Sequence, residues 1–246
     1  MVIWHALCMG GEHRLLLIHG LGATGRVWDR WREVLDERWP GRWDAPDLPG
    51  HGSAPRLPEY TFGSMAAGLA EQLDHDASYT VIGHSLGGVV GLVLAGGDYG
   101  IRVESVTGIG IKVAWTEDEL AKARSLADRP VTWFDDRDEA AARFLRVSGL
   151  TGLVGLDHEC IDAGLVREGE RWRLAMDPAT FGVGAPDMPA LLRRSRADVV
   201  LVRGENDPMN TDGQLAVLHP RVVTLPGLGH NAHVEDPEAI LRLIRP

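Results

Sequence analysis

Residues 79–91 read Y-T-V-I-G-H-S-L-G-G-V-V-G and contain the only G-x-S-x-G pattern of the chain, Gly83 to Gly87. A short apolar run precedes the pattern, and a small, apolar, helix-compatible segment follows it. Strand, sharp turn and helix in this order are the setting of a nucleophilic serine, whose strained turn requires very small residues on both sides. The stretch therefore predicts that Ser85 is a nucleophile. The alternative is a glycine-rich turn in which Ser85 only caps the following helix.

The composition is that of an ordinary globular protein. Of 246 residues, 44% are hydrophobic and 24% are charged, which suits one large α/β domain or two small ones. The net charge of −10 and the lack of a basic stripe argue against a nucleic-acid partner. Only Lys112 and Lys122 among the 25 basic residues are lysines, and we attribute this to compositional bias rather than to anion recognition. Cys8 and Cys160 have no metal-ligand spacing around them, so we expect no metal and no cofactor.

The first residues indicate the compartment. The sequence M-V-I-W-H-A-L-C has no basic leader, and His5 interrupts its apolar run, which does not fit a signal peptide. The longest apolar run, around Gly87 to Gly97, is too short to cross a bilayer. We therefore expect a cytoplasmic protein without a membrane partner.

A second glycine-rich loop, H-G-L-G-A-T-G at residues 19–25, also joins an apolar run to a helical pattern. One hypothesis is that the backbone N–H of Leu21 helps to hold an oxyanion. The other is dinucleotide binding, because Gly20-x-Gly22-x-x-Gly25 matches the dinucleotide fingerprint and two acids follow about 20 residues later. A fingerprint alone is weak evidence, and nothing downstream resembles the second half of a nucleotide domain. We favour the oxyanion hypothesis.

The rest of the chain alternates between predicted strands and helices, with one interruption. Strands are expected at residues 2–7, 15–18, 42–46, 79–83, 103–111, 199–202 and 221–225. From 112 to 189 the alternation stops, and we expect helices over 116–127 and 135–147 and an extended stretch at 170–176. We therefore divide the chain into a core, 1–111 and 190–246, and an insertion, 112–189.

Four candidate groups each follow a predicted strand: the loop at Leu21, then Ser85, Asp207 and His230. Because the carboxyl ends of parallel strands meet at one edge of a sheet, we expect these groups to lie close together.

The motifs together resemble the α/β-hydrolase fold family, in its serine-nucleophile, esterase-like branch with a helical lid. The matching stretches are residues 19–22, 47–52, 83–88, 204–208 and 229–237, which span nearly the whole chain. The resemblance implies an α/β fold, with a mostly parallel sheet, helices on both faces and residues 112–189 as the lid. Few residues precede Leu15, so we expect seven strands, without the first strand of the family.

The resemblance also implies the roles of the candidate residues. Ser85 would be the nucleophile, His230 the base and Asp207 the acid that orients the base. The backbone N–H groups of Leu21 and Leu86 would hold the oxyanion. His233 is a rival base and Glu205 a rival acid. We expect the substrate pocket to include Trp28, Trp115, Trp133, Phe134 and Met209.

We therefore expect a serine hydrolase that cleaves a small to medium carboxylic ester through an acyl-enzyme. Variants with the same triad cleave carbon–carbon bonds, lactones or amides, or form peracids. A small-molecule receptor with slow or no turnover is an alternative of another class, and a dinucleotide-binding protein is a remote one. The expected partner is a small ester or acyl compound, and the expected assembly is a monomer or homodimer.

Overall fold

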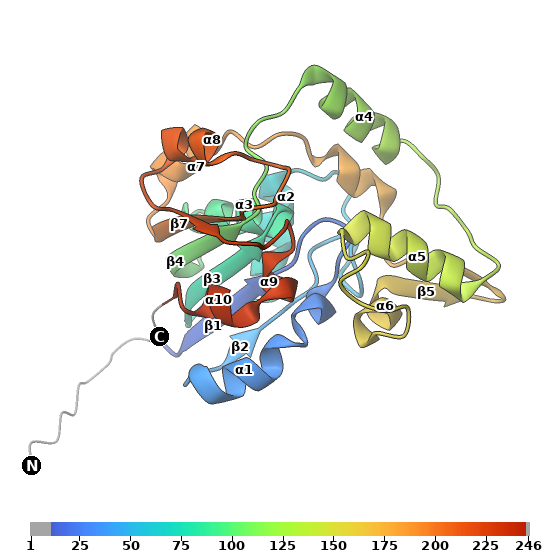
Figure 1. The fold of residues 1–246 in the computed structure, drawn as a ribbon, viewed down its shortest axis with the longest axis horizontal. Helices are drawn as coiled ribbons and strands as arrows, with labels where there is room; N and C mark the ends of the chain where they lie inside the picture. Colours follow the sequence, from blue (N-terminus) through green and yellow to red (C-terminus); the bar gives the residue numbers. More distant parts are fainter. Residues whose placement is uncertain (1–10, 245–246) are drawn as a thin grey trace, which may run out of the picture.

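The computed structural model describes residues 11–244, in which six strands form one sheet (Figure 1). Their order across the sheet is β2-β1-β3-β4-β7-β8, and every pairing is parallel. The strands are β1 (His13–Ile18), β2 (Trp43–Asp44), β3 (Ser78–His84), β4 (Arg102–Ile109), β7 (Asp198–Gly204) and β8 (Val222–Leu225). The expected α/β fold with a mostly parallel sheet is confirmed.

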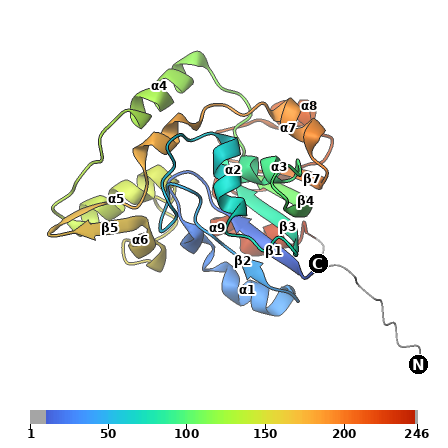
Figure 2. The ribbon, with the colours of Figure 1, turned by 180° about the vertical axis from the view of Figure 1, so that it is seen from behind.

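Helices cover both faces of the sheet because successive side chains of each strand point to opposite faces. In β1, Leu16 and Ile18 join one core cluster, and Leu15 and Leu17 join the other. The first cluster includes residues of α2 (Phe62–Ala70), α3 (Leu86–Leu94), α7 (Met188–Arg194) and α8 (Asp212–Leu218). The second includes residues of the 3-10 turn η1 (Gly25–Trp28), α1 (Trp31–Arg38), α9 (Ala232–Glu235) and α10 (Pro237–Leu241). Figure 2 shows α2 on the side of the sheet opposite to α1.

Six of the seven expected strands are present, and the seventh, at residues 2–7, lies outside the described residues. The strand expected at 42–46 is reduced to the two residues of β2. Pro46 has no N–H to donate to a neighbouring strand, which favours an early end to the pairing. Within residues 11–244, no helix is both long enough and apolar enough to span a membrane.

Between β4 and α7 the chain leaves the sheet and forms the insertion. Its elements are α4 (Glu117–Ala127), α5 (Arg137–Ser148), α6 (Glu159–Gly164), the antiparallel pair β5 (Leu165–Glu168) and β6 (Arg171–Leu174), and the 3-10 turn η2 (Pro178–Val183). The two expected helices are confirmed, and Thr116 forms the capping box of α4. The expected extended stretch corresponds to β6, whereas α6 and β5 were not predicted.

The insertion is attached to the core unevenly. Ala140 and Phe144 of α5 belong to the same core cluster as Trp28 and Trp31. In contrast, α4 has no buried residue and stands away from the sheet in Figure 1. Helix α5 therefore continues the core, whereas α4 packs mainly against η2 of the insertion.

Candidate active site

Ser85 lies in the turn between β3 and α3 with φ of 50° and ψ of −114°, the only positive φ of a non-glycine residue in the described chain. Its N–H donates a 2.7 Å hydrogen bond to the carbonyl of Ile109 in β4. A Cβ at Gly83 would lie 2.5 Å from the carbonyl oxygen of Gly87, and one at Gly87 would overlap the carbonyl of Ile18. Close backbone packing therefore requires both glycines. Ser85 makes no capping hydrogen bond, so the turn matches the strained nucleophile turn and not the helix-cap alternative.

Asp207 and His230 meet at the same edge of the sheet, after β7 and β8. The Nδ1 atom of His230 lies 3.1 Å from each carboxylate oxygen of Asp207. The Asp207 side chain is fully buried and accepts a 2.9 Å hydrogen bond from the N–H of Met209. A buried carboxylate in this place favours the Nδ1–H tautomer of the imidazole, which leaves Nε2 able to accept a proton.

The imidazole of His230 also lies close to the turn that carries Ser85. A Cβ at Gly110 would be 3.0 Å from Nδ1 of His230, and Gly110 directly follows the residue that binds the Ser85 N–H. Within residues 11–244, the Ser85 hydroxyl and the His230 ring do not form a hydrogen bond. Catalytic hydrogen bonds are often long without substrate and shorten when it binds. The structure therefore brings the His230 ring to the turn that carries Ser85, without a direct hydrogen bond between the two side chains in the described chain.

The rival base and the rival acid have other surroundings. The His233 side chain is fully buried, and neither of its ring nitrogens has a hydrogen-bond partner within the described residues. Burial lowers the pKa of His233 to about 3. Glu205 is exposed and accepts a 2.8 Å hydrogen bond from the N–H of Gly227. Neither residue joins the His230–Asp207 pair.

His84 supports this pair from behind. Its ring lies 4.7 Å from the ring of His230 and 4.2 Å from that of His233, measured between centroids. Its Nε2 lies 3.1 Å from the carbonyl oxygen of His230 and donates to it. Burial, and then the neighbouring histidines, lower the pKa of His84 well below its usual value. A neutral His84 therefore holds the backbone of His230 in place.

The loop after β1 presents Leu21 at the same site. Burial lowers the pKa of His19, and this neutral ring accepts the N–H of Leu48 at 2.9 Å and donates to the carbonyl of Gly20 at 2.8 Å. Within residues 11–244, the N–H groups of Leu21 and Leu86 have no acceptor. Leu86 opens α3, where the N–H groups have no partner inside the helix. Both N–H groups are therefore unpaired within the described residues.

Ser85, Leu21 and Leu86 line a cavity with about 790 Å³ of empty volume, part of it open to solvent, which we name the serine cavity. Its walls are mostly apolar, and they come from both the core and the insertion. The core contributes Phe62 and Val89, and the insertion contributes Trp115, Leu126 and Phe181. The apolar lining is typical of a site for a small molecule.

The sequence matches the alpha/beta hydrolase family over residues 15–243. The chain belongs to this family. It is 29% identical to lipase LipV of Mycobacterium tuberculosis over 195 residues, 78% of this chain and 70% of that protein. It is 42% identical to the pimeloyl-[acyl-carrier protein] methyl ester esterase of Neisseria meningitidis over 82 residues, 33% of this chain and only 30% of the esterase. The solved structure of E-2-(acetamidomethylene)succinate hydrolase superimposes with a TM-score of 0.76 at 23% identity, covering 95% of this chain and 91% of that one.

The family and these relatives make the chain a hydrolase of esterase-like type, which confirms the expected class of enzyme. Of the five side chains predicted for the substrate pocket, one, Trp115, lines the serine cavity. Trp28 is 0% exposed in the core, and Phe134 lines a different cavity. Trp133 lies under arginines of β6, and Met209 is 36% exposed beside the buried acid. The spacing of apolar residues in a sequence is the same for a core residue and for a residue of a cavity wall, so it could not separate the two.

The glycines of the dinucleotide fingerprint have structural uses in this hydrolase. A Cβ at Gly22 would overlap Val147 of the insertion, and one at Gly25 would overlap the backbone of Ala45. Asp47, one of the two acids that follow this loop by about 20 residues, accepts the N–H of Gly25 at 2.8 Å. Packing within the chain therefore accounts for the pattern without a nucleotide.

Sequence reasoning missed several residues of the serine cavity. From the sequence alone, Phe62 could be interpreted only as a residue of a helix. Lys112 and Lys122 also line the cavity, and they are the only lysines of the chain. Their rarity was the one signal that could have identified them. Within residues 11–244, no group of three His, Cys, Asp or Glu side chains is placed to hold a metal ion.

Proposed function

We propose that this hydrolase cleaves a small to medium carboxylic ester, with Ser85 as the nucleophile, His230 as the base and Asp207 as the acid that orients the base. The proposal is carried by the buried Asp207–His230 pair beside a strained serine that lines an apolar cavity. The lipase and the methyl ester esterase among the relatives favour an ester over other acyl compounds.

The reaction divides into two steps with the same base. Nε2 of His230 takes the hydroxyl proton of Ser85 while the Ser85 oxygen attacks the ester carbonyl. The imidazolium then protonates the leaving alcohol. Water hydrolyses the acyl-enzyme by the same route. Asp207 stays ionised and stabilises the charged imidazole.

The backbone N–H groups of Leu21 and Leu86 would stabilise the oxyanion in both steps. Both residues line the serine cavity, and both N–H groups lack an acceptor in the described chain. A donor in such a position contributes about 3 kcal/mol to the stability of the transition state.

The insertion, residues 112–189, would act as the lid of this site. Trp115, Leu126 and Phe181 belong to the insertion and line the cavity opposite side chains of the core. The lid would therefore set the choice of ester, and the core would supply the chemistry.

A serine-reactive fluorophosphonate probe tests the nucleophile. We expect the probe to label the wild-type protein and not Ser85→Ala, and we expect this variant to lose at least about 10³-fold in kcat on p-nitrophenyl esters. Ser125→Ala, at an exposed position of α4, is the matched control and should behave as wild type. Equal labelling of wild type and Ser85→Ala would contradict the proposal, and so would rapid labelling of the wild type without turnover of any ester.

A further inference from the structure

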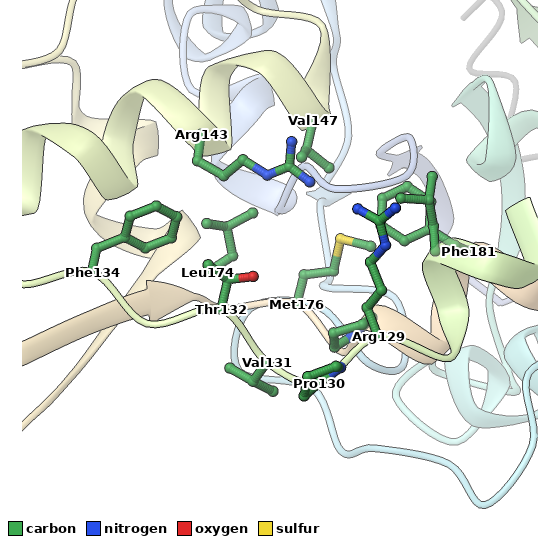
Figure 3. A pocket seen from close by; sticks show the side chains of 12 residues that line it. Arg129, Pro130, Val131, Thr132, Phe134, Arg143, Val147, Leu174, Met176 and Phe181 are labelled. Carbon is green, nitrogen blue, oxygen red and sulfur yellow. The ribbon is translucent and has the colours of Figure 1, made fainter. Parts of the chain in front are cut away.

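A second cavity lies inside the insertion (Figure 3), and we name it the arginine cavity. It has about 560 Å³ of empty volume, part of it open to solvent, and is bounded by the end of α4, residues 129–134, α5, β6 and η2. Most of its lining side chains are apolar. The polar ones are Thr132, Arg129 and Arg143, and no acidic residue is among them.

The two arginines have no partner within the described residues. Neither Arg129 nor Arg143 forms an ion pair or a side-chain hydrogen bond there, whereas Arg137 on the same helix as Arg143 binds Asp162 at 2.7 Å. Figure 3 shows both guanidinium groups on the same side of the cavity. Arg129 is exposed and Arg143 is partly buried, so an anion in this cavity would meet two guanidinium groups without partners in the described chain.

The arginine cavity is a neighbour of the serine cavity. Leu126 of α4 and Phe181 of η2 line both of them. The two cavities therefore adjoin at these two side chains.

The serine cavity is basic as well. Lys112 and Lys122 line it, and no acidic residue does. Lys112 binds Glu119 at 2.6 Å, whereas Lys122 forms no ion pair within residues 11–244. The whole chain has a net charge of −10, yet the two cavities together have four basic lining side chains and no acidic one. The positive charge is therefore concentrated where the substrate would bind, against the overall charge of the protein.

We infer that the substrate is an ester with an anionic end group, a carboxylate or a phosphate, which Arg129 and Arg143 bind while the ester bond lies at Ser85. This inference rests on the proposed esterase function and names its substrate class. A guanidinium group fits either anion through paired, charge-assisted hydrogen bonds. The apolar chain between the ester and the anion would lie against Leu126 and Phe181. The separation of Ser85 from the two arginines would then set the preferred chain length.

The test compares matched pairs of esters. Mono-p-nitrophenyl esters of linear dicarboxylic acids, from succinate to suberate, are each paired with a twin whose far carboxylate is a neutral amide. The readout is the ratio of kcat/KM for the charged ester over its twin. We expect wild type to prefer the charged ester by about 10- to 100-fold at one chain length, mainly through KM. Esters with a phosphate at the far end, measured in parallel, identify which anion is preferred.

The variants Arg129→Gln and Arg143→Gln should each lower this ratio, and the double variant should bring it close to one. Arg124→Gln on α4 and Arg146→Gln on α5 are the matched controls, because both positions are exposed and outside the cavity lining. These controls should keep the wild-type ratio. A wild-type ratio near one for both anions, an unchanged ratio in the double variant, or an equal loss in the controls would overturn the inference.

The design separates this inference from the proposed function. A wild-type enzyme that cleaves the amide twins without preferring the charged esters retains its esterase function and refutes the anionic substrate. If no ester is cleaved, the esterase proposal fails, and calorimetry with free dicarboxylates still tests the arginine cavity. Binding to wild type that is lost in the double variant supports the cavity as an anion site. No binding to wild type overturns it.

Discussion

Helices α3 and α4 both border the serine cavity, yet they are built in opposite ways. Eight of the nine residues of α3 are buried, and three of these are glycines that allow close packing. None of the eleven residues of α4 is buried, and its main contact is with η2 of the insertion. The helix that starts after Ser85 is enclosed by the fold, and the helix across the cavity is not.

The difference separates chemistry from substrate choice. A positive φ at a residue such as Ser85 costs about 1–3 kcal/mol and persists only where the surrounding structure fixes it. The packing around α3 supplies that constraint. No residue of α4 is buried, so a change there alters a cavity wall with little effect on the fold. Changes near α3 should therefore affect catalysis or stability, and changes in α4 should affect selectivity.

The largest expected effect comes from the buried side of this comparison. Asp207→Asn should lower kcat by about 10⁴-fold with little change in KM, because an amide favours the wrong tautomer of His230. Steady-state kinetics on a p-nitrophenyl ester measure this. Glu205→Gln is the matched control, and it should stay within a few-fold of wild type because the Glu205 carboxylate accepts the N–H of Gly227 and does not contact the His230 ring. A large loss of kcat in Glu205→Gln with near wild-type kcat in Asp207→Asn would assign the role of the acid to Glu205.

A pair of leucines tests the comparison through stability. Leu94→Ala in α3 removes a side chain that is 0% exposed and should lower the free energy of unfolding by about 2–5 kcal/mol. Leu126→Ala in α4 should cost less than about 1 kcal/mol, since Leu126 is only partly buried. Urea denaturation followed by circular dichroism gives both values. Leu126→Ala should instead change the relative kcat/KM of short and long esters. Equal losses of stability would show that α4 is as firmly packed as α3.

The core could be predicted because its signals are local. Apolar runs such as Leu15–Ile18 marked the buried strands, and glycines marked the backbone contacts around Ser85. The pairing of Asp207 with His230 followed from chain order, because groups after parallel strands meet at one edge of the sheet.

The cavities could not be predicted because segments that are far apart in the sequence pack together to form their walls. The apolar spacing around Trp28 would be the same if its side chain faced a pocket or the core. Only the packing of the helices in the folded chain places it in the core. Arg129 and Arg143 are two among many arginines in the sequence. Their common cavity arises only when residues 129–134, α5, β6 and η2 come together.

The smallest predicted effect concerns acid, and it follows from where the histidines lie. The core encloses four buried histidines, namely His19, His51, His84 and His233. Burial lowers the pKa of His51 and of His233 to about 3. The insertion has a single histidine, His158, which is partly exposed and caps α6. We therefore expect mild acid to destabilise the core through its own buried side chains.

The sign follows from which state binds protons. Between pH 6.5 and pH 3, His51 takes up a proton when the chain unfolds and stays neutral in the fold, so its stabilising effect is complete above about pH 6.5 and declines as the pH falls. Each such histidine adds a slope that approaches about 1.4 kcal/mol per pH unit. Urea denaturation between pH 6.5 and 5, above the range where carboxylates titrate, should give a shallower slope for His51→Gln than for wild type. An unchanged slope in His51→Gln would mean that the acid sensitivity does not arise from this buried histidine of the packed core.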